Sequence, residues 1–441
     1  MSVVSDYFLA LVLMLGLFIS PFSFSQEKQN TKQTQAISAS VFEKLQEAQE
    51  MMENSNFEQA NETIDILLGQ TRLSSYERSH ALNLKAYGYY MQQEYGLAIN
   101  VYHQVLSLDG LSKGLRLSTL KTLSQLYFSV EKYEDALEMI DRFIANVEDA
   151  EPEIQMIRGQ SLYQLGRYRE AIAPLKNAIE EVQRQGVTPD ENWLLLLRAC
   201  YHEEEDFHAM LSILKVLVSE YPKVDYIKNI ASVFSELAQT ENALAMLEPL
   251  YESGLMSEEN EVLNLGNLYL LVGLPYKAAL TLEVGLSMGN LTENAKNLRL
   301  LSQAWSRAKE HTRSIAPMKK AAEITEDGEL YLRLAQSYMN VENWNLATKS
   351  LRQAITKGGL GRTDTAHIML GMALFNQKKL VAARDAFLNA RDYKESAKSA
   401  RQWLTYIDSE ISRDKALKRE APSRAKRTEN ALLKGIHSDY R

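Results

Sequence analysis

Cysteine, proline and glycine are all scarce in this sequence of 441 residues. It contains one cysteine, nine prolines and twenty glycines. Because Cys200 has no second cysteine to pair with, no disulfide can form within one molecule, and a small apolar residue packed inside a helix is its simplest interpretation. So few prolines and glycines exclude long flexible linkers inside the body of the chain.

A concentration of positive charge is also missing from most of the chain. Acidic residues outnumber basic ones by 57 to 49, which gives a formal net charge of −8 and a pI of about 5.6. Proteins that bind nucleic acid present a concentrated basic face to the phosphates. The even mixture of charges therefore excludes nucleic acid as the main partner.

Motifs for catalysis or metal binding are equally sparse. No Walker-type Gly-x-x-x-x-Gly-Lys phosphate loop is present, and the glycine-rich segment 358–361 follows a predicted helix, as a turn would. The densest group of histidines and acids, between His202 and His208, lacks the His-Glu-x-x-His spacing of a zinc site. We therefore expect a protein that is not an enzyme and has no catalytic, cofactor-binding or metal site.

The N-terminus has the pattern of an export signal. The apolar segment Tyr7–Ile19 is too short for a comfortable membrane span, and Ser23 and Ser25 place small residues before a cut at Gln26. These features predict a signal peptide over residues 1–25, a flexible linker over 26–39 and a periplasmic location. Because the first residues include Asp6 and no basic residue, retention of the segment as an anchor stays an alternative.

An internal repeat is the strongest pattern in the chain. A small residue is followed by a large one after three residues and by alanine nine residues later, as in Ala86, Tyr89 and Ala98. The last of these positions recurs at intervals of 33 to 39 residues. Its ten members are Ala60, Ala98, Ala136, Ala171, Met210, Ala243, Ala278, Ser314, Ala347 and Ala383.

This pattern resembles the tetratricopeptide-repeat (TPR) family, in which each repeat is a pair of antiparallel helices. The resemblance implies an all-α, right-handed superhelical solenoid of about ten repeats over residues 40–392. One helix pair cannot bury both of its apolar faces, so neighbouring repeats must stack into a continuous core. A C-terminal capping helix is expected over residues 393–412.

The composition changes after this helix. Eight lysines and arginines, from Lys415 to Arg441, stand against few acids, with Pro422 between them. The pattern predicts a basic, disordered tail over residues 413–441. Solvation of this tail is the simpler interpretation, and contact with an anionic surface is the alternative.

In the TPR family the first helix of each repeat lines a concave groove, and this implies a row of amide side chains there. An amide both donates and accepts hydrogen bonds, so such a row can bind the backbone of an extended peptide. An ordinary polar surface is the competing interpretation. The predicted row is Gln125, Gln160, Asn267, Gln303 and Gln336.

Two further sets of residues are expected in the groove. Four cations of the eighth and ninth repeats could hold an acidic segment or a C-terminal carboxylate, or form an ordinary solvated face. Three aromatic residues of the second to fourth repeats could anchor an apolar side chain, or belong to the core. The cations are Lys296, Arg299, Arg307 and Arg333, and the aromatic residues are Tyr90, Phe128 and Tyr163.

The plan of signal peptide and ten repeats also resembles the periplasmic TPR proteins that accompany TonB energy-transduction systems of Gram-negative bacteria. The segments that carry this resemblance are 46–49, 265–269 and 403–407. It implies a scaffold that assists TonB-dependent uptake of iron complexes by holding a protein partner. The alternatives are an envelope assembly or secretion factor for pili, polysaccharide or outer-membrane proteins, a cell-wall enzyme accessory and, without export, a cytoplasmic co-chaperone.

Overall fold

The computed structural model describes residues 37–438, with side chains as far as residue 418. The chain divides into two compact units, Met1–Val233 and Phe234–Arg441. The predicted signal peptide, 1–25, and most of the linker, 26–39, lie outside the described residues. No helix in the described part is both long and apolar enough to cross a membrane.

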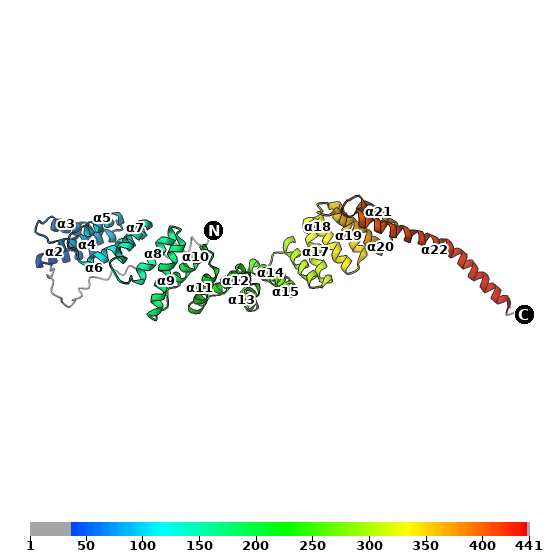
Figure 1. The fold of residues 1–441 in the computed structure, drawn as a ribbon, viewed down its shortest axis with the longest axis horizontal. Helices are drawn as coiled ribbons and strands as arrows, with labels where there is room; N and C mark the ends of the chain where they lie inside the picture. The colour runs from blue at the N-terminus through cyan, green and yellow to red at the C-terminus, as the bar shows by residue number, and fades with distance from the viewer. Residues whose placement is uncertain (1–36, 439–441) are drawn as a thin grey trace. The chain divides into compact units, whose positions relative to one another are not determined.

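All regular secondary structure of the described residues is helical (Figure 1). The helices that begin in the first unit are α2 Ala39–Glu53, α3 Phe57–Leu68, α4 Ser75–Met91, α5 Tyr95–Leu106, α6 Lys113–Ser129, α7 Tyr133–Ile144, α8 Pro152–Gln164, α9 Tyr168–Arg184, α10 Glu191–Glu203, α11 Phe207–Glu220 and α12 Val224–Glu236. Those of the second unit are α13 Thr240–Glu252, α14 Glu259–Leu271, α15 Pro275–Met288, α16 Ala295–Arg307, α17 His311–Thr325, α18 Gly328–Asn340, α19 Trp344–Lys357, α20 Thr363–Asn376, α21 Leu380–Arg391 and α22 Ala397–Ser438.

The predicted all-α repeat array is confirmed. The twenty helices from α2 to α21 correspond to the ten predicted repeats, two helices each. The repeating alanine positions are fully buried, for example Ala98, Ala171 and Ala278, whereas Met210 is half-buried. The first position of the pattern also needs a small residue because the two helices of a repeat touch. A Cβ at Gly159 of α8, the first position of the fourth repeat, would lie 2.3 Å from the Leu175 side chain of α9.

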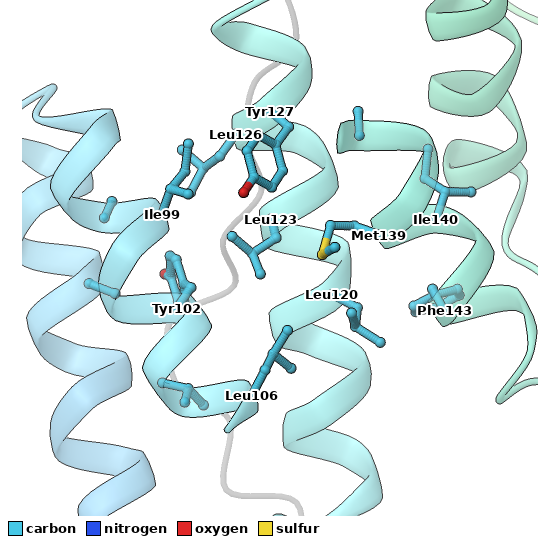
Figure 2. Close-up of a cluster of buried hydrophobic side chains, with 14 of the residues drawn as sticks. Ile99, Tyr102, Leu106, Leu120, Leu123, Leu126, Tyr127, Met139, Ile140 and Phe143 are labelled. Carbon is cyan, nitrogen blue, oxygen red and sulfur yellow. The ribbon is translucent and has the colours of Figure 1, made fainter. Parts of the chain in front are cut away.

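Stacking of neighbouring helices builds the core. Figure 2 shows this in the first unit, where apolar side chains of α6 contact those of α5 on one side and α7 on the other. No single repeat can bury both faces of its helices, so each repeat depends on the next one for stability. The labelled side chains are Ile99, Tyr102, Leu106, Leu120, Leu123, Leu126, Tyr127, Met139, Ile140 and Phe143.

One backbone conformation recurs at the turn inside each repeat. Five residues before the repeating alanine position, the backbone is always left-handed, and glycine supplies it only at Gly166 and Gly273. A side chain at such a position costs energy that glycine avoids. The other eight residues are Ser55, Gln93, Glu131, Glu205, Ala238, Lys309, Glu342 and Lys378.

We expect the Glu131→Gly substitution to stabilise the first unit. It removes the strain of a side chain at φ 61° and should raise the free energy of unfolding by about 0.5–1 kcal/mol. The matched control is Gly166→Ala, where a Cβ meets no atom within 4 Å, so that only the backbone strain at φ 71° is added. This variant should lose about 1 kcal/mol. Urea unfolding followed by circular dichroism measures both, and destabilisation by Glu131→Gly would contradict the interpretation.

The C-terminal helix differs from the prediction. Its first turns cover the last repeat, where Leu404 and Ile407 are buried and the Trp403 ring stacks on Phe387 with centroids 5.1 Å apart. The sequence predicts a disordered tail from residue 413, but α22 continues as helix to Ser438. The segment is rich in alanine, lysine, arginine, glutamate and leucine, which favour helix. Its basic charge and its proline favoured a disordered tail in the sequence-based prediction.

Candidate partner-binding site

A pocket of about 390 Å³ lies between α14 and α16, the first helices of the seventh and eighth repeats. Each helix contributes side chains three or four residues apart, which is the spacing that puts them on one helical face. The lining residues are Asn260, Leu263, Asn264 and Asn267 from α14, and Lys296, Asn297, Arg299, Leu300 and Gln303 from α16.

The pocket is electropositive. Lys296 and Arg299 are exposed, and neither forms an ion pair with any carboxylate of the described residues. Lys296 also lies in the first turn of α16, where the helix dipole already favours a negative charge. The charge of Lys296 helps to lower the pKa of the nearby Glu259 and is therefore partly balanced, so Arg299 is the cation that a bound anion would chiefly neutralise.

Hydrogen bonds fix the floor of the pocket. The Asn297 side chain donates to Glu259 Oε1 at 2.7 Å and to the Thr292 carbonyl at 2.9 Å, and the Thr292 hydroxyl donates to Glu259 Oε2 at 2.7 Å. These bonds, first that from Thr292 and then that from Asn297, lower the pKa of Glu259. The Glu259 carboxylate thus ties α14 to the start of α16 and holds the lining side chains in register.

The structure brings together four of the predicted groove residues of the second unit. Asn267, Lys296, Arg299 and Gln303 all line the pocket. The other three predicted groove residues of this unit, Arg307, Arg333 and Gln336, are exposed and do not line the pocket. Arg307 ends α16, whereas Arg333 and Gln336 belong to α18.

The first unit does not present the predicted row of amides. Gln125 is half-buried, and Gln160 is only 8% exposed. The Gln160 Oε1 atom is buried without a hydrogen-bond partner. Gln160 is therefore part of the helix packing of α8, because stacking of the neighbouring repeat covers a position that the sequence pattern places on the surface.

The predicted aromatic anchors pack across turns. Tyr90 contacts Tyr95, Phe128 contacts Tyr133 and Tyr163 contacts Tyr168, with ring centroids 6.0, 5.5 and 5.2 Å apart. Each pair joins the end of a first helix to the start of the second helix of the same repeat. Tyr90 and Phe128 also pack against the buried core, so the core interpretation describes them better than the anchor interpretation.

Five lining residues were not predicted from the sequence: Asn260, Leu263, Asn264, Asn297 and Leu300. The groove prediction took one position per repeat, and a search at helical spacing from Asn267 would have found Asn260 and Asn264.

It also missed Arg198 of α10 in the first unit. Burial lowers the pKa of this arginine, its Nε has no hydrogen-bond partner, and it forms no ion pair within the described residues. No motif marks this position, so only the fold could reveal it.

One spacing typical of a catalytic motif does occur in the sequence. Residues 285–289 read Gly-Leu-Ser-Met-Gly, the spacing of a nucleophile elbow. That elbow requires a sharp turn between a strand and a helix. Here Ser287 lies in the last turn of α15, and its hydroxyl donates to the Val284 carbonyl at 2.9 Å. The segment is the end of a helix and lacks the geometry of a nucleophile.

Comparison with known proteins agrees with the helix pairing. The family model for the tetratricopeptide repeat matches residues 122–185 and 332–400, one segment in each unit. The search of curated proteins gives no match.

Several solved structures are similar at low identity. A TPR2AB-domain complex of yeast Sti1 is 16% identical, covers 60% of this chain and 99% of its own, and has a TM-score of 0.33. YrrB, described as a TPR protein with an unusual peptide-binding site, is 17% identical. The match covers 43% of this chain and 95% of YrrB, with a TM-score of 0.35. A TPR protein from Parabacteroides merdae is 16% identical. The match covers 58% of this chain and 98% of that protein, with a TM-score of 0.32.

The fold and the matched segments define the class of this protein. It is an all-α helical-repeat protein built from sequential helix pairs. Its helix pairs form a tetratricopeptide-repeat array, and the model of the tetratricopeptide-repeat family matches two segments of it. Proteins of this family are generally non-catalytic scaffolds that mediate contacts between proteins.

Proposed function

We propose that this protein is a non-catalytic scaffold that holds an extended, acidic segment of a partner protein in the pocket between α14 and α16. The observation that carries the proposal is the pair of unpaired cations, Lys296 and Arg299, among the pocket's amide side chains. Charge-assisted hydrogen bonds from lysine and arginine to carboxylates are among the strongest polar contacts in proteins. An acidic peptide supplies the missing negative charge.

The other lining residues suit a peptide. Asn260, Asn264 and Gln303 can each donate to a carbonyl and accept from an amide of an extended backbone. Leu263 and Leu300 offer apolar contact for the aliphatic part of a side chain. Amides thus bind the backbone in any sequence, and the cations select for acidic residues.

The location and partner belong to the same proposal. The signal-like N-terminus supports export to the periplasm, and the resemblance of segments 46–49, 265–269 and 403–407 supports a place beside a TonB system. The partner would then be a component of TonB-dependent uptake of iron complexes. An envelope assembly or secretion factor uses the same pocket for a different client and is the second candidate.

The identity of the partner can be tested by photo-crosslinking. A photoreactive residue at Asn264 of the full chain, produced in cells, should attach to whatever occupies the pocket. Recovery of TonB-system proteins through an acidic segment would support the finer proposal. Recovery of pilus, polysaccharide or secretion proteins would move the function to envelope assembly, and N-terminal sequencing of the recovered chain would show whether residues 1–25 have been removed.

The chemistry of the pocket can be tested with the captured partner. The Lys296→Glu/Arg299→Glu double variant should bind about 10–100-fold more weakly, because charge-assisted bonds are replaced by repulsion. The matched control, Arg307→Glu/Arg333→Glu, changes the net charge equally at exposed residues outside the pocket. Isothermal titration calorimetry measures both affinities. Equal losses in the two variants would show that the pocket does not select the acidic segment.

A further inference from the structure

The C-terminal helix α22 continues well past the repeat that it covers (Figure 1). Among the described side chains, Ile411 is the last of α22 that packs against the apolar cluster of the final repeat. Every residue from 412 to 418 is exposed, and the helix runs on to Ser438. Capping of the array therefore accounts for the first turns of α22 and gives no role to residues 413–438, the terminal segment.

The terminal segment reverses the charge of the chain. It contains eight lysines and arginines and three acids, whereas the whole chain has 49 and 57. Lys415 is exposed and forms no ion pair with any described side chain, whereas Lys418 pairs with Asp414 at 3.2 Å. The segment thus has a net positive charge that the chain as a whole lacks.

Helical register separates these charges from the apolar residues. Successive residues of a helix are about 100° apart, so each position of the segment can be assigned to a face. One face has apolar or small residues at intervals of four or seven, and the opposite face has five cations and no acid. The apolar face carries Leu417, Ala421, Ala425, Leu432 and Ile436. The basic face carries Lys415, Arg419, Lys426, Arg427 and Lys434. Such a separation defines a basic amphipathic helix.

An anionic membrane surface is the partner that fits both faces. Leucine and isoleucine gain from burial at the boundary between headgroups and acyl chains, and lysine and arginine gain from anionic headgroups. A nucleic acid would neutralise the cations but leave the apolar face in water, where Leu417 is already 53% exposed. An acidic protein would need fixed carboxylates in register with the whole basic face, whereas lipids diffuse to wherever a cation lies.

We propose that the terminal segment of α22 binds the surface of an anionic lipid membrane, with the face of Leu417 and Leu432 toward the acyl chains and the cations among the headgroups. This contact is separate from the pocket between α14 and α16, and it adds membrane attachment to the proposed scaffold function. The attachment is reversible, because a single amphipathic helix buries few side chains and its charges are screened by salt.

Flotation of the full chain with lipid vesicles tests the attachment. Vesicles of equal parts phosphatidylglycerol and phosphatidylcholine should bind the wild-type protein and release it as salt is raised. Vesicles of phosphatidylcholine alone should bind little. The Lys415→Glu/Arg419→Glu/Lys426→Glu variant should bind the anionic vesicles about 100-fold more weakly, because each cation near the surface contributes to affinity. The matched control, Arg72→Glu/Lys132→Glu/Lys309→Glu, makes the same change of charge at exposed residues of the array and should bind like wild type.

Two adjacent leucines test the orientation of the helix. Leu432 lies on the apolar face, and Leu433 is turned from it by about 100° toward the basic face. Leu432→Ser should weaken binding to the anionic vesicles about tenfold, because one apolar side chain leaves the membrane. Leu433→Ser makes the same change of composition and should bind like wild type.

Each part of the proposal can fail separately. No binding to anionic vesicles would overturn it, and binding to heparin instead would assign the terminal segment to a polyanion. Equal binding to both kinds of vesicle would indicate an apolar anchor elsewhere in the chain and would overturn it too. Equal losses in the two leucine variants would rule out the assigned face. The Lys296→Glu/Arg299→Glu variant should bind vesicles like wild type, so that a failure of the pocket proposal is distinguishable from a failure of this one.

Discussion

Replacing Trp305 by alanine should lower the free energy of unfolding of the second unit by about 3–5 kcal/mol, the cost of removing a large buried aromatic side chain. Trp305 lies on α16 and has no exposed surface. The Arg313 guanidinium lies 3.5 Å from the centroid of its ring, and the Tyr276 ring meets it edge-on at 5.4 Å. Alanine would leave a cavity and remove both ring contacts.

A phenylalanine variant separates the packing of the ring from its polar group. The indole Nε1 of Trp305 is buried with no hydrogen-bond partner, so losing this N–H removes an unsatisfied donor. Trp305→Phe should therefore cost only about 1 kcal/mol, because most of the ring is retained. Urea unfolding measures both variants, and hydrogen exchange should localise the loss to α15–α17. Equal losses for alanine and phenylalanine would contradict the packing argument.

Replacing Glu77 by glutamine should destabilise the first unit at neutral pH by about 2–3 kcal/mol. The buried carboxylate accepts bonds from the backbone amide and hydroxyl of Ser38, at 3.0 and 2.7 Å, and from those of Ser74, at 3.0 and 2.8 Å. These bonds, led by that from the Ser38 hydroxyl, lower the pKa of Glu77 from 4.5 to about 2. One carboxylate therefore joins the N-termini of α2 and α4.

The lowered pKa sets the pH dependence of this effect. A carboxyl whose pKa is lower in the folded state stabilises the protein above its unfolded pKa, and this stability is lost as the pH falls. The difference between wild type and Glu77→Gln should thus be full above about pH 5 and nearly vanish at about pH 2. Thermal unfolding at several pH values measures it, with the exposed Glu58→Gln as control. A difference that does not change with pH would show that the charge of Glu77 is not involved.

The pattern of small and large residues predicted the repeats well because its causes are local. Ala98 and Ala171 mark where two adjacent helices touch, and that contact depends only on a helix hairpin some thirty residues long. The left-handed turn residue is equally regular, but glycine fills it only at Gly166 and Gly273. No residue type in the sequence therefore marks that turn, although its position, five residues before the repeating alanine, is fixed by the repeat.

The candidate site was predicted in part. Counting one position per repeat found Asn267 and Gln303, and the local excess of cations found Lys296 and Arg299. The same counting placed Gln160 on the surface, whereas the structure buries it. How far a first-helix position is covered depends on the size of the side chains in the next repeat, and no single repeat contains that information.

The Glu77 cluster shows the same limit over a longer distance. The capping bond from Ser74 is readable from a spacing of three residues. Ser38, which contributes the leading effect on the pKa, stands 39 residues away in the chain. Nothing in the sequence of either segment predicts that contact.

The sequence by itself determined the helices, their pairing and their number, because helical periodicity and small residues at helix contacts act over short stretches of chain. The tertiary structure alone decided which cations share a pocket, which amide is buried and which carboxylate gathers four hydrogen bonds. Those outcomes depend on how neighbouring repeats stack, and stacking brings together side chains whose distance along the chain carries no signal.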